Sequence, residues 1–189
     1  MAGWTRVKWT EAGQVTELLD WPADSVESAR SSPETYFRNL RSASRLESAV
    51  FFLGMALPRQ ETVAWAARAV RDLVEGLERP RADTDALRAA LLWVQDPSEG
   101  RRRAAFDAAQ HADMSSPERL AAMAVFLSGG SLAPENVQPV PAPPDVAGRI
   151  GAGAILVAAG RRSDRIAAIN RALDAGDEIA QWGLNGRPE

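Results

Sequence analysis

The sequence predicts an all-α protein, either a single-domain helical bundle or stacked helical hairpins, with about seven to eight helices. Apolar residues recur at helical spacing, as at Leu46, Val50 and Leu53. No useful length of chain alternates apolar and polar residues with the period of two that marks a half-buried strand. Ser-Pro-Glu at 32–34 and at 116–118 marks two helix starts, because serine caps the first turn and proline fits its first position.

The first predicted helices lie between the N-terminus and residue 57. Residues 15–19 have helical spacing, and Pro22 follows them, which ends a helix because proline disfavours helical geometry at the residue before it. A second helix starts at Pro33. A third covers 46–57 and is apolar on all faces, which predicts that it lies at the centre of the bundle.

Pro58 predicts a break, because its ring would collide with the carbonyl of Gly54 in a continuous helix. The next helix presents Val63, Val70 and other apolar residues inward, and its charged residues face water. Further helices are expected at 83–95, 98–112, 117–127 and 150–160, and a last one runs from a cap at Ser163 to the residue before Gly183.

The domain organisation is one helical domain at 32–183, an N-terminal extension with a short helix at 1–31, and a tail at 184–189. A chain of 189 residues is long enough to bury a sizeable core. Residues 131–144 contain five prolines and form neither helix nor central strand. They are expected to run extended, mainly as a strap on the protein's own surface and alternatively as a polyproline ligand for an aromatic groove.

The small residues near the C-terminus predict close helix packing. Gly148, Gly151 and Gly153 resemble a nucleotide loop only loosely, because no strand precedes them. The small residues at 148, 151, 152, 154, 158 and 159 are expected instead to let another helix approach closely. Between Arg149 and Arg161 the apolar run is too short to cross a bilayer, because a helix of that length spans roughly 16 Å of a core of roughly 30 Å.

Composition excludes several kinds of site. There is no cysteine, so disulfides and zinc–thiolate sites are absent, and no cofactor is expected. The net charge is −3, and the one basic cluster, Arg101 to Arg103, is expected to be a solvated face, so a nucleic-acid partner is disfavoured. The N-terminus has no apolar segment typical of a secretory signal, which favours the cytoplasm.

The sequence does not establish an enzyme. His111 is the only histidine, so a multi-histidine metal site cannot form, and we predict no catalytic or metal-binding residue. The alternative is a small helical hydrolase-type enzyme that uses carboxylates, or His111 with Asp107 four residues before it. Ser128 and Ser131 lack a nucleophile elbow and are interpreted as parts of a helix end.

Tryptophan suggests a surface that binds a protein. Six tryptophans are more than one helical domain needs for packing, and tryptophan is common at partner-binding hot spots as well as in cores. Trp65 follows the polar residues Arg59, Gln60 and Glu61. These four residues are the predicted partner-binding site, with Trp65 as anchor and Arg59 as its polar neighbour.

Three segments carry a resemblance. They are SPETYFRNLRSASRLESAVFFLGMALPRQETVAWAARAV, WVQDPSEGRRRAAFDAAQ and FLSGGSLAPENVQPVPAPP. Together, over about residues 32–160, the chain resembles an uncharacterised bacterial family of helical domains encoded beside type VI secretion components. The most distinctive pieces are 57–66 and 128–132. The resemblance implies a cytoplasmic accessory role and carries no catalytic residues, and it leaves out the first 31 residues.

The function predicted first is a non-enzymatic adaptor or chaperone-like protein. It would bind a protein partner, either a secretion component or an effector, through a helical surface. The sequence does not identify the partner or the oligomeric state.

Overall fold

The computed structural model describes residues 3–22, 25–134 and 136–186. Within these residues the chain forms ten α-helices and no strand, which confirms the all-α prediction. The expected count of about seven to eight was too low, and the five-residue α2 had no counterpart in the expected elements. The helices are α1 (Ala12–Leu18), α2 (Val26–Arg30), α3 (Pro33–Ser42), α4 (Leu46–Ala56), α5 (Arg59–Val74), α6 (Arg81–Gln95), α7 (Glu99–His111), α8 (Pro117–Leu127), α9 (Val146–Gly160) and α10 (Arg165–Trp182).

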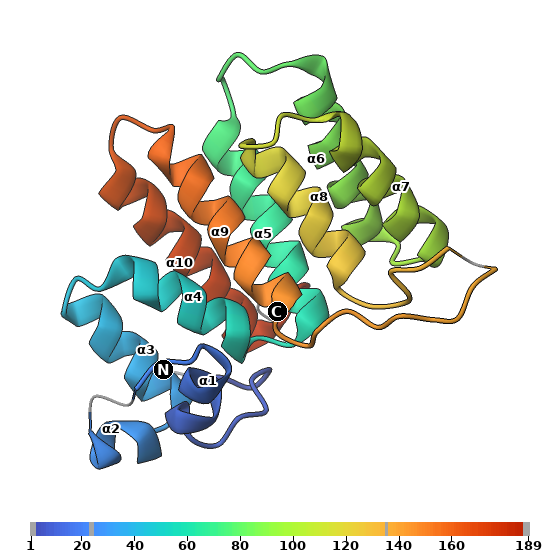
Figure 1. The fold of residues 1–189 in the computed structure, drawn as a ribbon. Helices are drawn as coiled ribbons and strands as arrows, with labels where there is room; N and C mark the ends of the chain where they lie inside the picture. Colours follow the sequence, from blue (N-terminus) through green and yellow to red (C-terminus); the bar gives the residue numbers. More distant parts are fainter. Residues whose placement is uncertain (1–2, 23–24, 135, 187–189) are drawn as a thin grey trace.

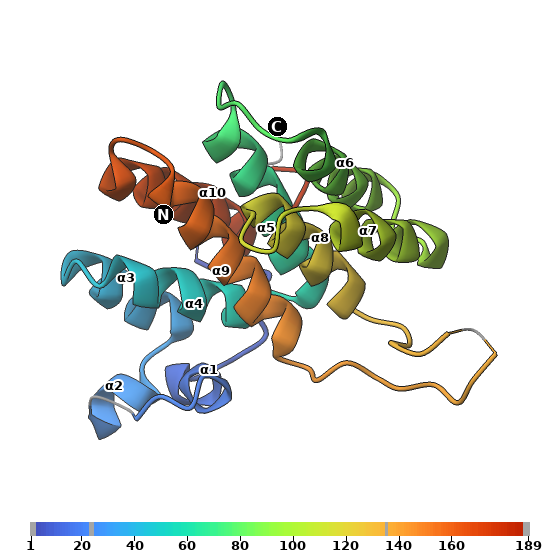
Figure 2. The same cartoon turned by 45° about the horizontal axis from the view of Figure 1, so that its top comes forward.

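Helix α5 lies at the centre of the fold, with α6, α7 and α8 on one side and α4 and α10 on the other (Figure 1). It packs against α4, α6, α8, α9 and α10. Figure 2 shows the short α1 and α2 together at the end of the molecule beside α3. Helix α4, predicted to be central, is also largely buried and packs against five helices, α1, α3, α5, α9 and α10, so it shares the interior with α5. Residues 61–67 of α5 are buried on every face, because three alanines and a threonine there let neighbours approach from all sides.

The helix starts follow the expected chemistry with one exception. The Ser32 side chain accepts a hydrogen bond from the amide of Thr35, and Ser116 accepts one from Arg119, with proline next in both cases. The cap of α10 is Asp164 and not Ser163, since the Asp164 carboxylate accepts from the amide of Ala167 at 2.9 Å. Its end at Gly183 is as expected.

Trp65 packs where α4, α5 and α10 meet. It is 1% exposed, and its indole nitrogen donates a 2.7 Å hydrogen bond to the carbonyl oxygen of Ala172. Buried indole groups need such a partner, because an unpaired donor is costly. Gly176 makes the contact possible, since a Cβ at this position would lie 2.6 Å from Leu53 and 2.7 Å from the indole. The sequence did not predict this close approach.

Small residues bring α9 close to α4 and α5, as expected. A Cβ on Gly148 would lie 2.7 Å from the carbonyl oxygen of Gly54, and one on Gly151 would lie 3.1 Å from Ala66. The two helices therefore approach almost backbone to backbone. Gly148 and Gly151 therefore serve close packing, whereas a Cβ on Gly153 would meet nothing within 4 Å.

Residues 3–31 pack on the same core as the rest of the chain. Ala12 and Val15 of α1 are fully buried. The Trp4 indole nitrogen donates to Asp177 at 2.5 Å, and its ring lies 5.1 Å from the ring of Phe37. Of the predicted tail, Leu184 accepts a hydrogen bond from Arg68 through its carbonyl, while residues 187–189 lie outside the described residues, as do 1–2 and 23–24 of the predicted extension.

Two glycine-to-alanine substitutions test the packing at Trp65. Gly176→Ala should lower the free energy of unfolding by about 2 kcal/mol, because overpacking outweighs the gain in helix propensity. Gly153→Ala on α9 is the matched control: its Cβ would meet nothing within 4 Å, so stability should rise by about 0.5–1 kcal/mol. Urea unfolding of both variants measures the difference. Equal stabilities would contradict the packing described here.

Candidate functional site

The α4–α5 corner, residues 57–60, is a rigid turn between two well-packed helices. Leu57 is extended and Pro58 follows it, so the helical hydrogen-bond ladder stops between them. The hydroxyl of Thr62 donates to the carbonyl oxygen of Gly54 at 2.9 Å, which satisfies one of the carbonyls left without a partner at the end of α4. The predicted break at Pro58 is confirmed.

The four residues of the predicted partner-binding site divide between surface and interior. Arg59 and Gln60 are exposed at the start of α5. Glu61 and Trp65 are buried, and the Glu61 carboxylate pairs with Arg6 at 2.7 Å. The prediction that Trp65 anchors a partner is therefore wrong for this structure, because its indole is enclosed by α10 and α4. A tryptophan among alanines gave no signal that separates a core role from a docking role.

The corner contacts a distant segment through Arg59. Its Nη1 donates to the carbonyl oxygen of Ser128 at 3.0 Å. The structure thus brings together the two most distinctive pieces of the sequence, 57–66 and 128–132. Arg59 and Ser128, where the two pieces meet, lie at the ends of α4 and α8, near the start of α9 (Figure 1).

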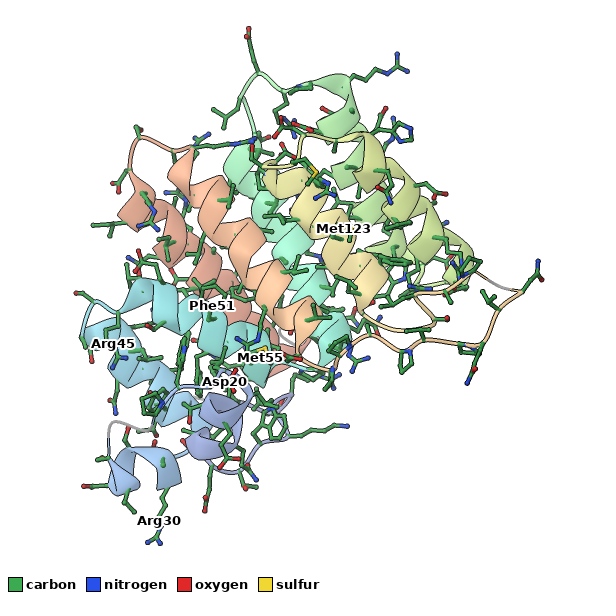
Figure 3. All side chains as sticks on the ribbon, in the orientation of Figure 1. Asp20, Arg30, Arg45, Phe51, Met55 and Met123 are labelled. Atoms are coloured by element: carbon green, nitrogen blue, oxygen red, sulfur yellow. The ribbon has the colours of Figure 1, made fainter. Side chains whose placement is uncertain are left out.

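A groove, which we call the corner groove, opens beside this turn with a volume of about 340 Å³. Its walls come from four places in the chain: the N-terminal segment, the end of α1, the corner with the end of α4, and the start of α9. Figure 3 shows Met55 at the end of α4, close to α1 and α9. The lining residues are Lys8, Trp9, Leu18, Gly54, Met55, Ala56, Leu57, Pro58, Arg59, Thr62, Pro144 and Gly148.

The corner groove contains two residues that the sequence analysis did not select. Trp9 is 37% exposed, and Lys8 beside it is exposed. Lys8 is the only lysine in the chain, which is the one feature of the sequence that distinguishes it. A single cation that belongs to no motif does not indicate a binding site. Only the folding of residues 3–11 across the end of α4 places it at a groove.

A sequence profile of a family of unknown function, DUF6931, matches residues 36–180. The chain belongs to this family. No curated protein and no solved structure matched the chain. In the described part of this DUF6931 protein, no helix is both long enough and apolar enough to cross a membrane. The matched region starts after Lys8 and Trp9, so one wall of the corner groove lies outside the family match.

Arg102 of this DUF6931 protein is a buried hub and not part of a solvated face, which corrects the expectation for Arg101 to Arg103. It is 3% exposed, and its guanidinium makes two 2.7 Å hydrogen bonds to the carboxylate of Glu99. It also donates to the carbonyl oxygen of Ser131 at 2.8 Å and lies over the ring of Phe126. The hydrogen bond from Arg102 is the main reason that the pKa of Glu99 is lowered.

The other two arginines of the cluster also have local partners. Arg101 donates to the carbonyl oxygen of Leu92 at 2.6 Å and lies 3.3 Å from Asp96. Arg103 donates to the carbonyl oxygen of Ala133 at 2.9 Å. Arg102 and Arg103 share Glu99 and the carbonyl oxygen of Ser131, whereas Arg101 pairs with Asp96, so each of the three cations is engaged by oxygen atoms of the protein itself.

The proline-rich loop 131–144 folds back on itself before α9 begins. Ser131 and Pro141 form an isolated antiparallel bridge, and the Leu132 amide donates to the carbonyl oxygen of Val140 at 2.8 Å. Arg102 and Arg103 hold the base of the loop, while both ribbon views show its outer part projecting from the body (Figures 1 and 2). It is therefore extended as predicted, but only its base is packed as a strap. Val137 and Val140 are 55% and 50% exposed.

The alternative enzymatic site does not form as a carboxylate–imidazole pair. The Nδ1 atom of His111 lies 2.9 Å from the main-chain oxygen of Asp107, not from its carboxylate. Both residues are exposed in an open groove between α6 and α7, together with Asp85, whose carboxylate is already paired with Arg88 at 2.6 Å. In the part of the chain that the structure describes, no group of three or more acidic or histidine side chains is arranged to hold a metal ion.

Arg102→Lys should lower the free energy of unfolding by about 2–4 kcal/mol, because lysine cannot reproduce the two-pronged contact with Glu99 or the stacking on Phe126. Arg101→Lys, next to it in the same helix, keeps a cation near Asp96 and should change stability by less than about 0.5 kcal/mol. Chemical denaturation of both variants measures the contrast. An unchanged free energy of unfolding in Arg102→Lys would contradict the stabilising role of the buried Arg102 contacts.

Proposed function

We propose that this protein is a non-enzymatic adaptor or chaperone-like accessory protein that binds another protein through the α4–α5 corner. The observation that supports the proposal is the corner groove, where Trp9, Met55 and Pro144 offer apolar surface beside exposed Arg59 and Gln60. Partly exposed tryptophan beside arginine is the composition typical of binding hot spots. The outer part of loop 131–144, which starts from the same region, adds the exposed side chains of Val137 and Val140.

The corner suits a binding role because it is held in place before a partner arrives. Pro58 fixes the turn, and the buried contacts of Trp65 fix the helices on either side of it. A preorganised surface binds more tightly, since little conformational entropy is lost on association.

The setting we propose is type VI secretion, with a secretion component or an effector as the partner and the bacterial cytoplasm as the location. This part rests on the resemblance carried by residues 57–66 and 128–132. The hydrogen bond between Arg59 and Ser128 supports a shared role for these two pieces, because it joins one residue of each.

Affinity purification from the native bacterium, with secretion genes expressed, tests the proposal. A tagged wild-type chain should recover a partner that can be identified and then bound again as a purified protein. Trp9→Ala should weaken that binding about 30-fold, as for a hot-spot tryptophan. Ile166→Ala on α10 removes another exposed apolar side chain, 66% exposed, away from the groove and should leave binding unchanged. A partner that binds both variants equally would overturn the proposed surface.

A further inference from the structure

The corner groove has an unusual charge distribution for this protein. Two cations, Lys8 and Arg59, line it, and none of its described lining residues is acidic. Arg59 is hydrogen bonded only to the carbonyl oxygen of Ser128, and no described carboxylate pairs with Lys8. Elsewhere, arginines commonly have carboxylate partners, as Arg6 has Glu61. The groove thus has two cations that form no ion pair among the described residues, in a chain whose net charge is −3.

The walls of the groove strengthen the effect of these charges. Trp9, Met55 and Pro144 present apolar surface next to the two cations. Apolar walls lower the local dielectric, so an anionic group that enters the groove is attracted more strongly than at an open surface. An apolar ligand without negative charge would bury the walls and leave both cations without partners.

We propose that the groove binds an acidic, amphipathic peptide segment of the partner protein. One apolar side chain of that segment occupies the groove against Trp9 and Met55, and its neighbouring carboxylates contact Lys8 and Arg59. A volume of about 340 Å³ is near the lower end of ligand pockets and holds one or two side chains, not a whole helix. This inference rests on the proposed function, whose partner it describes.

A peptide fits the groove better than a nucleic acid does. Nucleic-acid interfaces are polar and strongly basic, and they need several phosphate contacts to gain affinity. The corner groove offers two cations and is otherwise lined mostly by apolar or small residues. Binding of single-stranded nucleic acid at the groove would therefore count against the proposal, as would a second copy of this chain seated there.

The test is a selection of short random peptides displayed on phage against the full chain. Enriched peptides should combine an excess of Asp and Glu with a large apolar residue. Lys8→Glu with Arg59→Glu should weaken their binding by about tenfold or more, because like charges then meet across the groove. Raising the salt concentration from about 0.05 to 0.5 M should also weaken the wild-type complex.

A matched control keeps the same change of net charge away from the groove. Arg30 and Arg171 are exposed, and neither pairs with a described carboxylate. Figure 3 shows Arg30 at the outer tip of α2, away from Met55. Arg30→Glu with Arg171→Glu should leave peptide binding within about twofold of wild type, since distant exposed charges are screened. Thermal unfolding of both double variants checks that each is folded.

Lys8 allows the binding position to be observed directly. Reductive methylation with ¹³C-formaldehyde labels the only lysine in the chain and leaves its positive charge in place. Its resonance should shift on addition of an enriched acidic peptide and should shift much less with the same peptide carrying Gln and Asn in place of Glu and Asp.

The outcomes separate this inference from the proposed function. Enrichment of neutral or basic peptides, no enrichment at all, or an unmoved Lys8 resonance would each overturn the acidic ligand. So would a dimer in sedimentation that Lys8→Glu with Arg59→Glu dissociates. If the native partner still depends on Trp9 in any of these cases, the adaptor role stands and only its ligand chemistry is wrong. If acidic peptides are not enriched and the native partner does not depend on Trp9, both proposals are wrong.

Discussion

The buried indole of Trp65 fixes the relative positions of α4, α5 and α10. Its N–H bonds the carbonyl of Ala172, and its ring fills space that Gly176 leaves free beside Leu53. A hydrogen bond in this dry environment is geometrically demanding, because an unpaired indole or carbonyl would cost free energy. The end of α4 and the start of α5 are therefore held in one arrangement. The α4–α5 corner at the surface is rigid because the buried contacts of Trp65 hold both helices in place.

The proposed binding surface is built by neighbours of the corner and not by the residue that looked most suitable for docking. With Trp65 inside, the corner itself offers only Arg59 and Gln60 to solvent. The apolar component comes from Trp9 in the N-terminal segment and from Pro144 before α9. Four parts of the chain, the N-terminal segment, the end of α1, the corner with the end of α4, and the start of α9, thus make one groove.

The arginines show two uses of the same side chain. Arg102 is buried and fully engaged, with Glu99, main-chain oxygens and the ring of Phe126 around it, so it holds the base of the proline-rich loop. Glu118 at the start of α8 is a buried carboxylate with two arginine partners. It is fully buried and lies 3.6 Å from Arg79 and 3.3 Å from Arg161. Charges at these places are structural. At the corner groove, by contrast, Arg59 donates only to the main-chain oxygen of Ser128, and neither it nor Lys8 pairs with a carboxylate among the described residues.

The sequence by itself determined the longer helices, the caps at Ser32 and Ser116 and the break at Pro58, because these depend on local chemistry: periodicity, serine before proline, and a missing amide hydrogen. It also predicted that the glycines of α9 serve close packing. It could not separate a core tryptophan from an exposed one, or a buried arginine from a solvated one, since burial depends on which distant elements meet. Only the tertiary structure decided that α5 shares the interior with α4, that Arg102 is inside, and that Lys8, Trp9 and Arg59 share a groove.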